Sequence, residues 1–308
     1  MIPIFISGCD RSGTTLLGSI IGSANNAIAV PESQFLINLY RLSLNGMLCP
    51  NKASSFLSSN KRFLIWNSSI PSFEGVKKIK TGEFIERLVE NYSIQKKENL
   101  KFWVDHSPGH ICYLMRLCEI FPEARFIHMV RDGRAVAASI LSLPDWPFGT
   151  VYGVAQHWIK RVGIGVAAEC SLKDKILRVH YENLLKNPKI VLQKICNFIG
   201  LDYEERMLKG NGFKVPEYTK QQHQLVGKGI FIKRIDAWKK ELSVNDIRVF
   251  ESVCGDMLPY LGYELCFPHS NKVVKRLSAI SAMLVDAIYA VRSNIKRNRR
   301  FKNSYVEH

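Results

Sequence analysis

The sequence predicts a three-layer α/β fold in which helices flank a central parallel sheet. Short apolar segments at residues 2–6, 125–130 and 176–179 have the length and composition of buried strands. Each is followed by a segment with helical periodicity. Strands that alternate with helices form parallel sheets, because the helix returns the chain to the start of the next strand.

The expected elements follow from this alternation in chain order. The first strand leads through a loop at 7–13 to a helix at 14–22, packed by apolar residues. Residues 38–100 are polar and mixed, with a helix expected near 84–91. A strand at 101–104, a loop at 105–109 and a helix through 119 come next. The strand at 125–130 and helices at 134–143 and 151–170 follow. The last elements are the strand at 176–179, the segment 181–185 and a helix near 190–199.

Composition places the chain among ordinary globular proteins. Of its 308 residues, 46% are hydrophobic and 23% charged, which excludes a disordered, collagen-like or disulfide-scaffold chain. The formal net charge of +16 indicates an anionic partner, such as a nucleotide, a polyanion, a nucleic acid or a membrane surface. The eight cysteines form no C-x-x-C pair, so we expect reduced thiols, mostly buried.

A glycine-rich segment after the first strand is nearly a nucleotide-binding loop. Gly8-Cys-Asp-Arg-Ser-Gly-Thr-Thr15 has the glycine spacing of G-x-x-x-x-G-K-[ST], and it lies between a strand and a helix. Such P-loop-like segments hold an anion on backbone N–H groups at the helix N-terminus. Thr14 replaces the lysine that contacts the terminal phosphates of a nucleoside triphosphate, which argues against an ATPase or GTPase. An ordinary strand-to-helix turn remains the alternative.

A second anion site is expected at the end of the strand at 125–130. Arg131 ends this strand, and Ser139 lies on the helix that follows. Open α/β sheets bind ligands where strands end and helices begin, and an arginine can hold a phosphate through two N–H groups. Two such ends on one sheet favour a ligand with two anionic groups. A surface ion pair and a helix serine would explain the same residues.

Together these segments resemble sulfotransferases that use 3′-phosphoadenosine 5′-phosphosulfate (PAPS). The resemblance is closest to the bacterial and tyrosylprotein-type branch, and it covers about residues 2–265. The matching motifs are R-S-G-T-T-L-L, R-D-G-R-A-x-x-x-S, Val30-Pro-Glu-Ser-Gln-Phe35, Trp103-Val-Asp-His-Ser-Pro108, Val179-His-Tyr-Glu-Asn-Leu184 and Arg234-Ile-Asp-Ala-Trp-Lys-Lys-Glu-Leu242.

The resemblance implies a cofactor site for PAPS and its product PAP, without a metal. The 5′-phosphosulfate would be held by Arg11, Ser12, Gly13, Thr14 and Thr15. Arg131 and Ser139 would hold the 3′-phosphate, Tyr181 would lie near the cofactor, and Lys228 with Arg234 would complete the anion site. Tyr181 could instead be an aromatic residue that caps the end of a strand. Lys228 and Arg234 could instead belong to a solvated basic face. Trp238 is expected in the core.

The resemblance also implies in-line sulfuryl transfer to a hydroxyl, or less readily to an amine. Glu32 matches the family's catalytic glutamate and would accept the proton of the acceptor hydroxyl. A helix-start carboxylate is the alternative. His106 stands where relatives often have lysine; it could be a cation, a neutral hydrogen-bond donor, a base or a backbone-bonded loop histidine. Arg11 would add positive charge near the sulfuryl group.

The acceptor is left open among a carbohydrate, a glycolipid, a small metabolite and a peptide tyrosine. The segments at 38–100 and 143–153 are expected to build its pocket, where Trp66, Trp146, Phe148 and Tyr152 could stack on it or belong to the core. Two other functions compete: a P-loop kinase or nucleotide hydrolase, and a non-catalytic basic protein that binds a membrane or polyanion. No nucleic-acid-binding motif is evident.

The C-terminal residues form a separate segment in this interpretation. We expect a sulfotransferase domain at 1–266 and a basic amphipathic helix and tail at 267–308, because apolar residues from Leu277 to Val291 share one helix face before a basic cluster. The helix would lie on an anionic membrane, or dock on the domain or a second subunit of a homodimer. No signal peptide or spanning segment is evident, so we expect a cytoplasmic protein, with peripheral contact at the inner membrane surface an option.

Overall fold

A parallel five-stranded sheet forms the centre of the protein. The structure is a computed structural model and describes residues 1–94, 99–143, 146–216, 235–267 and 276–305. The strand order is β2-β5-β1-β6-β7, and all four neighbouring pairs are parallel. The strands are β2 (Ala27–Ala29), β5 (Phe102–Asp105), β1 (Ile2–Gly8), β6 (Arg125–Val130) and β7 (Ile176–His180). The predicted parallel sheet is therefore confirmed.

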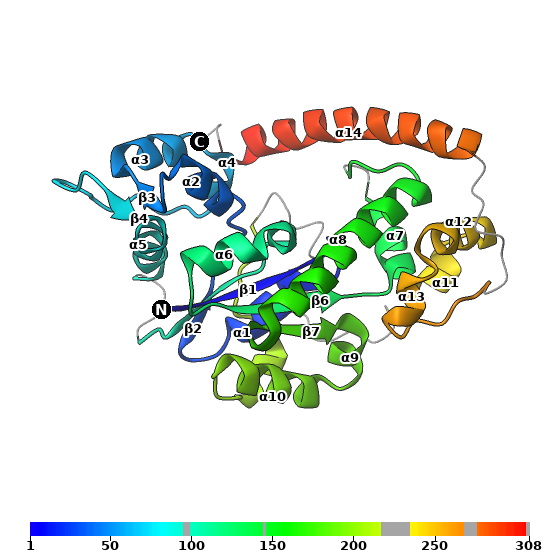
Figure 1. Cartoon of the computed structure of the whole chain (residues 1–308), viewed down its shortest axis with the longest axis horizontal. Helices are drawn as coiled ribbons and strands as arrows, with labels where there is room; N and C mark the ends of the chain where they lie inside the picture. The colour runs from blue at the N-terminus through cyan, green and yellow to red at the C-terminus, as the bar shows by residue number, and fades with distance from the viewer. Residues whose placement is uncertain (95–98, 144–145, 217–234, 268–275, 306–308) are drawn as a thin grey trace.

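Helices cover both faces of this sheet (Figure 1). Because side chains alternate along a strand, Ile4 and Ile6 point into one apolar cluster and Phe5 into another. The first face packs against α1 (Thr14–Ile21), α9 (Tyr181–Lys186) and α10 (Pro188–Ile199). The Phe5 face packs against η1 (Pro108–Tyr113), α6 (Leu114–Ile120) and α8 (Val151–Leu172), and η2 (Lys173–Lys175) follows α8. The three-layer architecture is thus confirmed.

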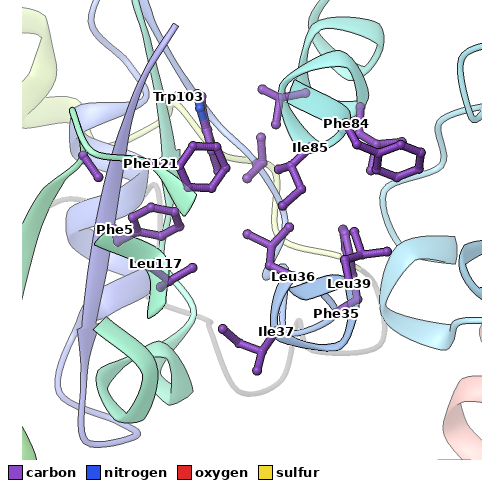
Figure 2. Close-up of a cluster of buried hydrophobic side chains, with 14 of the residues drawn as sticks. Phe5, Phe35, Leu36, Ile37, Leu39, Phe84, Ile85, Trp103, Leu117 and Phe121 are labelled. Carbon is purple, nitrogen blue, oxygen red and sulfur yellow. The ribbon is translucent and has the colours of Figure 1, made fainter. Parts of the chain in front are cut away.

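A helical region between β2 and β5 extends the core beyond the sheet. It contains α2 (Leu36–Leu42), α3 (Pro50–Ser58), α4 (Lys61–Leu64), α5 (Thr81–Ser93) and the antiparallel pair β3 (Met47–Leu48) and β4 (Ile79–Lys80). Figure 2 shows Phe5 and Trp103 of the sheet facing Leu36 of α2 and Ile85 of α5. The sequence predicted only α5 here, because the other helices are short and their apolar spacing is weak.

A third apolar cluster joins α7 (Gly133–Leu141) and α8 to α11 (Trp238–Glu241), α12 (Val244–Cys254) and α13 (Met257–Tyr260). Arg134 links these elements: its guanidinium lies 2.8 Å from Asp132, 2.7 Å from Glu251 and 4.2 Å from the ring centre of Trp238. Trp238 is 3% exposed, which confirms its expected place in the core. The short helix η3 (Glu205–Lys209) follows α10.

The C-terminal segment contains α14 (Arg276–Tyr305), a helix of 30 residues that runs along one side of the molecule (Figure 1). Within the described residues, no helix combines the length and apolar character needed to cross a bilayer. All eight cysteines are free, and the expectation of burial is wrong for Cys170 and Cys266, which are exposed. The proposed boundary at residue 266 stays a prediction.

Candidate active site

The loop between β1 and α1 presents a helix N-terminus to the carboxyl edge of the sheet. Gly13 caps α1 with φ at 94° and offers no side-chain hydrogen bond to the first turn. The first N–H groups of a helix lack partners within it, so a terminus of this kind suits an anion. A Cβ atom on Gly13 would lie 2.5 Å from the ring of Tyr181, so this residue must be glycine for two reasons. Thr14 and Thr15 are buried behind it.

Four residues predicted to hold the cofactor contact one another across this edge. Nε of Arg11 donates to Oγ of Ser139 at 3.2 Å, and Nη1 of Arg131 donates to the backbone oxygen of Arg11 at 2.8 Å. The Arg131 guanidinium also lies 4.6 Å from the ring centre of Tyr181. Because these residues follow β1, β6 and β7, the sheet has brought three separate segments to one place.

Polar atoms in this cluster are buried without a protein partner. Among the described residues, neither Oγ of Ser12 nor Nε of Arg131 has a hydrogen-bond partner. A buried polar atom without a partner costs about 1–3 kcal/mol, which an anionic ligand would recover. Arg11 also has φ at 65°, a strained conformation for a non-glycine residue that is typical of binding loops. The donors present therefore fit a ligand with more than one anionic group.

Glu32 lies beyond the end of β2, close to two other carboxylates. Its side chain is 24% exposed; Nη1 of Arg62 lies 3.9 Å from Oε2, and Nε2 of Gln34 donates to the same oxygen at 3.1 Å. Burial raises the pKa of Glu32 to about 7; Arg62 opposes the shift, whereas the charges of Asp10 and Asp105 add to it. Helix α2 begins only at Leu36, so the alternative of a helix-start carboxylate is wrong.

A buried hydrogen-bond network holds the Glu32 segment against the end of β5. Oγ of Ser33 donates to Asp105, and the N–H of Ser33 donates to Oγ of Ser107 at 2.9 Å. The N–H of Ser107 in turn donates to Oδ1 of Asp105 at 2.7 Å. This network lies one residue from Glu32 on one segment and one residue from His106 on the other, so it positions both.

His106 is buried between α1 and the segment after η3. Its ring packs edge-on against Phe213 at 4.6 Å, and a Cβ on Gly18 would come within 2.8 Å of it. Neither ring nitrogen has a hydrogen-bond partner among the described residues. Burial lowers the pKa of His106 to about 4, although Asp105 opposes this shift. Burial therefore favours the neutral side chain near pH 7, and the cationic role of His106 stays a prediction.

The structure adds a pair that sequence reasoning missed. Nε2 of His157 on α8 lies 2.7 Å from Oδ2 of Asp10 in the loop after β1. Burial disfavours the ionised form of Asp10, but the hydrogen bond and charge of His157 outweigh it and lower the pKa of Asp10. Asp10 lies inside the recognised loop motif, yet its partner is 147 residues away, and no local pattern indicates it.

The other predicted residues have three different outcomes. Lys228 and Arg234 lie outside the described residues. Trp66 is 2% exposed and packs on Phe35 and Phe63, so it belongs to the core and cannot stack on an acceptor. Trp146, Phe148 and Tyr152 are partly buried, and Phe148 lies 5.0 Å from the ring of His157, beside the candidate site.

Comparisons with known proteins show the family to which this chain belongs. Residues 3–205 match the sulfotransferase family, about two thirds of the chain. The chain is 24% identical over 281 residues to a protein-tyrosine sulfotransferase of Drosophila melanogaster, covering 87% of this chain and 52% of that protein. It is 23% identical over 313 residues to the nodulation protein NoeE of Sinorhizobium fredii, covering 90% of this chain and 70% of that protein. The chain thus spans about half the length of the Drosophila relative.

The fold agrees with a solved structure of the same kind. The sulfotransferase domain of a Synechococcus olefin synthase superposes with a TM-score of 0.55 at 21% identity, covering 82% of this chain and 93% of that one. At this identity the likeness shows the fold alone, and it confirms the P-loop-like architecture predicted from the strand–loop–helix unit. The match to residues 3–205 shows the family directly: this chain belongs to the sulfotransferases.

Proposed function

We propose that the protein transfers the sulfuryl group of PAPS to an acceptor hydroxyl, giving PAP and a sulfated product. The observation that supports this most is the contact of Arg11, Ser139, Arg131 and Tyr181 at the N-terminus of α1. Arg11, Ser12, Gly13, Thr14 and Thr15 would hold the 5′-phosphosulfate. Arg131 and Ser139 would hold the 3′-phosphate. Oγ of Ser12 and Nε of Arg131, buried without a hydrogen-bond partner in the described part of the chain, suit two anionic groups better than one.

Bound PAPS would supply an activated sulfuryl group with a phosphate leaving group. In the overall reaction a bond forms between the acceptor oxygen and sulfur while the bond from sulfur to the phosphate oxygen breaks. Glu32 accepts the acceptor proton, for which its pKa of about 7 is well suited: the carboxylate is substantially ionised at neutral pH and still a competent base. Arg11 adds fixed positive charge in a loop whose backbone is already organised.

His106 acts in this proposal as a neutral hydrogen-bonding group rather than as a cation. A histidine with a pKa near 4 carries no charge at pH 7 and would donate one N–H. Its packing between Gly18 and Phe213 fixes the ring plane. In this proposal Glu32 moves the proton, and His106 orients a reacting group or donates a hydrogen bond to it.

The acceptor in this proposal is an alcohol or phenol, with an amine less favoured. Relatives at 24% and 23% identity carry different names, so identity selects none of the carbohydrate, glycolipid, metabolite or peptide tyrosine classes. Metal-independent turnover, a cytoplasmic location and a homodimer stay predictions.

Titration of PAP into the protein by isothermal calorimetry tests the proposed function. The wild type should bind PAP without Mg²⁺ and more tightly than ATP, whereas Arg131→Ala should lose roughly 10-fold or more in affinity, the cost of a charged hydrogen bond. Arg125→Ala, at the opposite end of the same strand, is the matched control and should bind as wild type.

The two competing functions give different results in the same titration. A kinase or nucleotide hydrolase would prefer ATP and require Mg²⁺. A generic polyanion-binding protein would respond equally to Arg131→Ala and Arg125→Ala, because each variant removes one positive charge.

A further inference from the structure

One face of α14 is apolar, and among the described residues it is exposed to solvent between Ile280 and Ile295. Along this face six aliphatic side chains are each between 50% and 64% exposed: Ile280, Met283, Leu284, Ile288, Val291 and Ile295. At 100° per residue they lie within an arc of about 140°, the width of the apolar side of an amphipathic helix. Single exposed apolar residues are ordinary, but a continuous stripe along a helix marks an interaction surface.

The opposite face of α14 fixes the helix to the body of the protein. Oδ1 of Asp286 accepts hydrogen bonds from the N–H groups of Gly149 and Thr150, at 2.8 Å and 3.0 Å, and Oδ2 accepts from the hydroxyl of Thr150 at 2.8 Å. Ser293 is buried, 3% exposed, on the same side of the helix. Between Ile280 and Ile295 the apolar stripe therefore lies on the side of the helix away from Asp286 and Ser293.

A second attachment lies near the C-terminal end of α14. Nζ of Lys61 on α4 donates to Oδ1 of Asn298 at 3.1 Å and lies 5.5 Å from the ring centre of Phe301, which is 6% exposed. The helix is thus joined at two places, to the start of α8 and to α4 (Figure 1). At 100° per residue Asn298 and Phe301 continue the face of the stripe, so the stripe is exposed only between Ile280 and Ile295.

The positive charge of α14 favours an anionic partner for its apolar face. Residues 276–305 contain seven basic residues and a single acidic one, Asp286, for a net charge of +6. Asp286 is engaged with the start of α8, so it cannot pair with an incoming surface. Six of the basic residues fall within the final turns: Arg292, Lys296, Arg297, Arg299, Arg300 and Lys302.

We propose that α14 docks the protein on an anionic lipid bilayer, with its aliphatic stripe in the acyl boundary and Arg292 and Arg299 at the headgroups. Aliphatic residues in the centre with Arg and Lys at the flanks are the pattern of helices that lie in a membrane interface. At 100° per residue, Arg292 and Arg299 lie at the flank of the stripe, where long side chains reach headgroups. A second copy of this chain would instead bring together two strongly cationic helices, which is unfavourable.

Docking would also set how the candidate site faces the lipid. The first attachment of α14 adjoins α8, whose His157 pairs with Asp10, and the second adjoins Arg62, which lies beside Glu32. The docked helix would therefore hold both the His157–Asp10 pair and Glu32 near the bilayer surface. The lipid inference itself does not depend on sulfuryl transfer.

Vesicle flotation of the full-length protein tests this inference. The wild type should float with vesicles that contain phosphatidylserine and much less with pure phosphatidylcholine, and added salt should weaken binding. Leu284→Glu with Val291→Glu should reduce binding by ~10-fold or more, because two buried aliphatic contacts are lost. The matched control is Leu44→Glu with Ile190→Glu, which makes the same chemical change at exposed positions away from α14.

The outcomes are distinguishable. Equal flotation of the two double variants, or no flotation of the wild type, would overturn the proposal. So would a concentration-dependent dimer in sedimentation velocity that the Leu284 and Val291 changes abolish, because a second copy would then cover the stripe. Circular dichroism should show the same helix content and melting temperature for both double variants, since all four positions are exposed.

Discussion

The Nε atom of Arg11 donates a hydrogen bond to the hydroxyl of Ser139 at 3.2 Å, across 128 residues of sequence. This bond joins the loop after β1 to the helix after β6. The two segments that the motifs predict to hold anions therefore lie side by side in the candidate site.

Ser139→Ala should weaken PAP binding by roughly 3- to 10-fold, the range expected for one hydrogen bond. The fold should be unaffected, because the hydroxyl is near the edge of the site and alanine suits a helix. Fluorescence or calorimetric titration with PAP measures the change. Ser252→Ala, whose hydroxyl bonds only within its own helix α12, should bind PAP as wild type. Equal losses in both variants would mean that Ser139 acts through helix stability instead.

The turnover rate should rise with pH through about 7 and level off above it. Glu32 accepts a proton only when ionised, and burial raises its pKa to about 7. His106, with a pKa of about 4, adds no second limb near neutral pH. Steady-state rates across this range provide the measurement. Glu32→Gln should remove the limb and lower kcat by roughly 10²–10⁴-fold, while an unchanged pH profile in that variant would assign the base elsewhere.

Glu32→Gln should also stabilise the protein at alkaline pH. A carboxyl whose folded pKa is raised favours the folded state while protonated. Its contribution is complete below its unfolded pKa, near 4.5, and is lost as pH rises through about 7. The variant should gain on the order of 2 kcal/mol over wild type above that range, with little difference under acidic conditions. Urea unfolding at several pH values measures this. A variant that is less stable than wild type at alkaline pH would contradict the raised pKa.

Replacing Arg131 should mainly weaken PAP binding, whereas replacing Arg134, three residues further along, should mainly destabilise the fold. Arg134→Ala leaves Glu251 buried at 4% exposure without its charged partner, which typically costs about 3–5 kcal/mol. Arg131→Ala should instead reduce PAP affinity with a smaller loss of stability. Chemical unfolding of both variants measures the two losses in the free energy of unfolding. As a control, Arg116→Ala removes an exposed ion pair with Glu119 and should change stability little, because solvent screens such a pair.

The sequence predicted the parts of the site that lie where strands end. Arg11 and Arg131 follow apolar segments that could only be buried strands, and parallel strands place their carboxyl ends along one edge. The sheet, α1, α8 and the site residues from three segments could therefore be inferred without coordinates. Strand β2 was missed because Ala27–Ala29 is short and its small side chains give no distinctive pattern.

Properties that depend on tertiary burial could not be predicted. The charge of His106 depends on Gly18 and Phe213, which enclose it from distant parts of the chain. The pKa of Glu32 depends on Asp10 and Asp105, which reach it from different strands. Trp66 looked equally suited to an acceptor pocket and to a core, and only its packing on Phe35 assigns it to the core.

Transfer of labelled sulfate from PAPS tests the central claim most directly. The protein is incubated with ³⁵S-labelled PAPS and a mixed panel of alcohols, sugars, glycolipids and tyrosine peptides, and label in any product is counted. The account predicts Mg²⁺-independent transfer by the wild type, and its loss in Glu32→Gln although that variant still binds PAP. Transfer by Glu32→Gln at the wild-type rate would contradict the role of Glu32, and failure of the wild type to bind PAP at all would contradict the account as a whole.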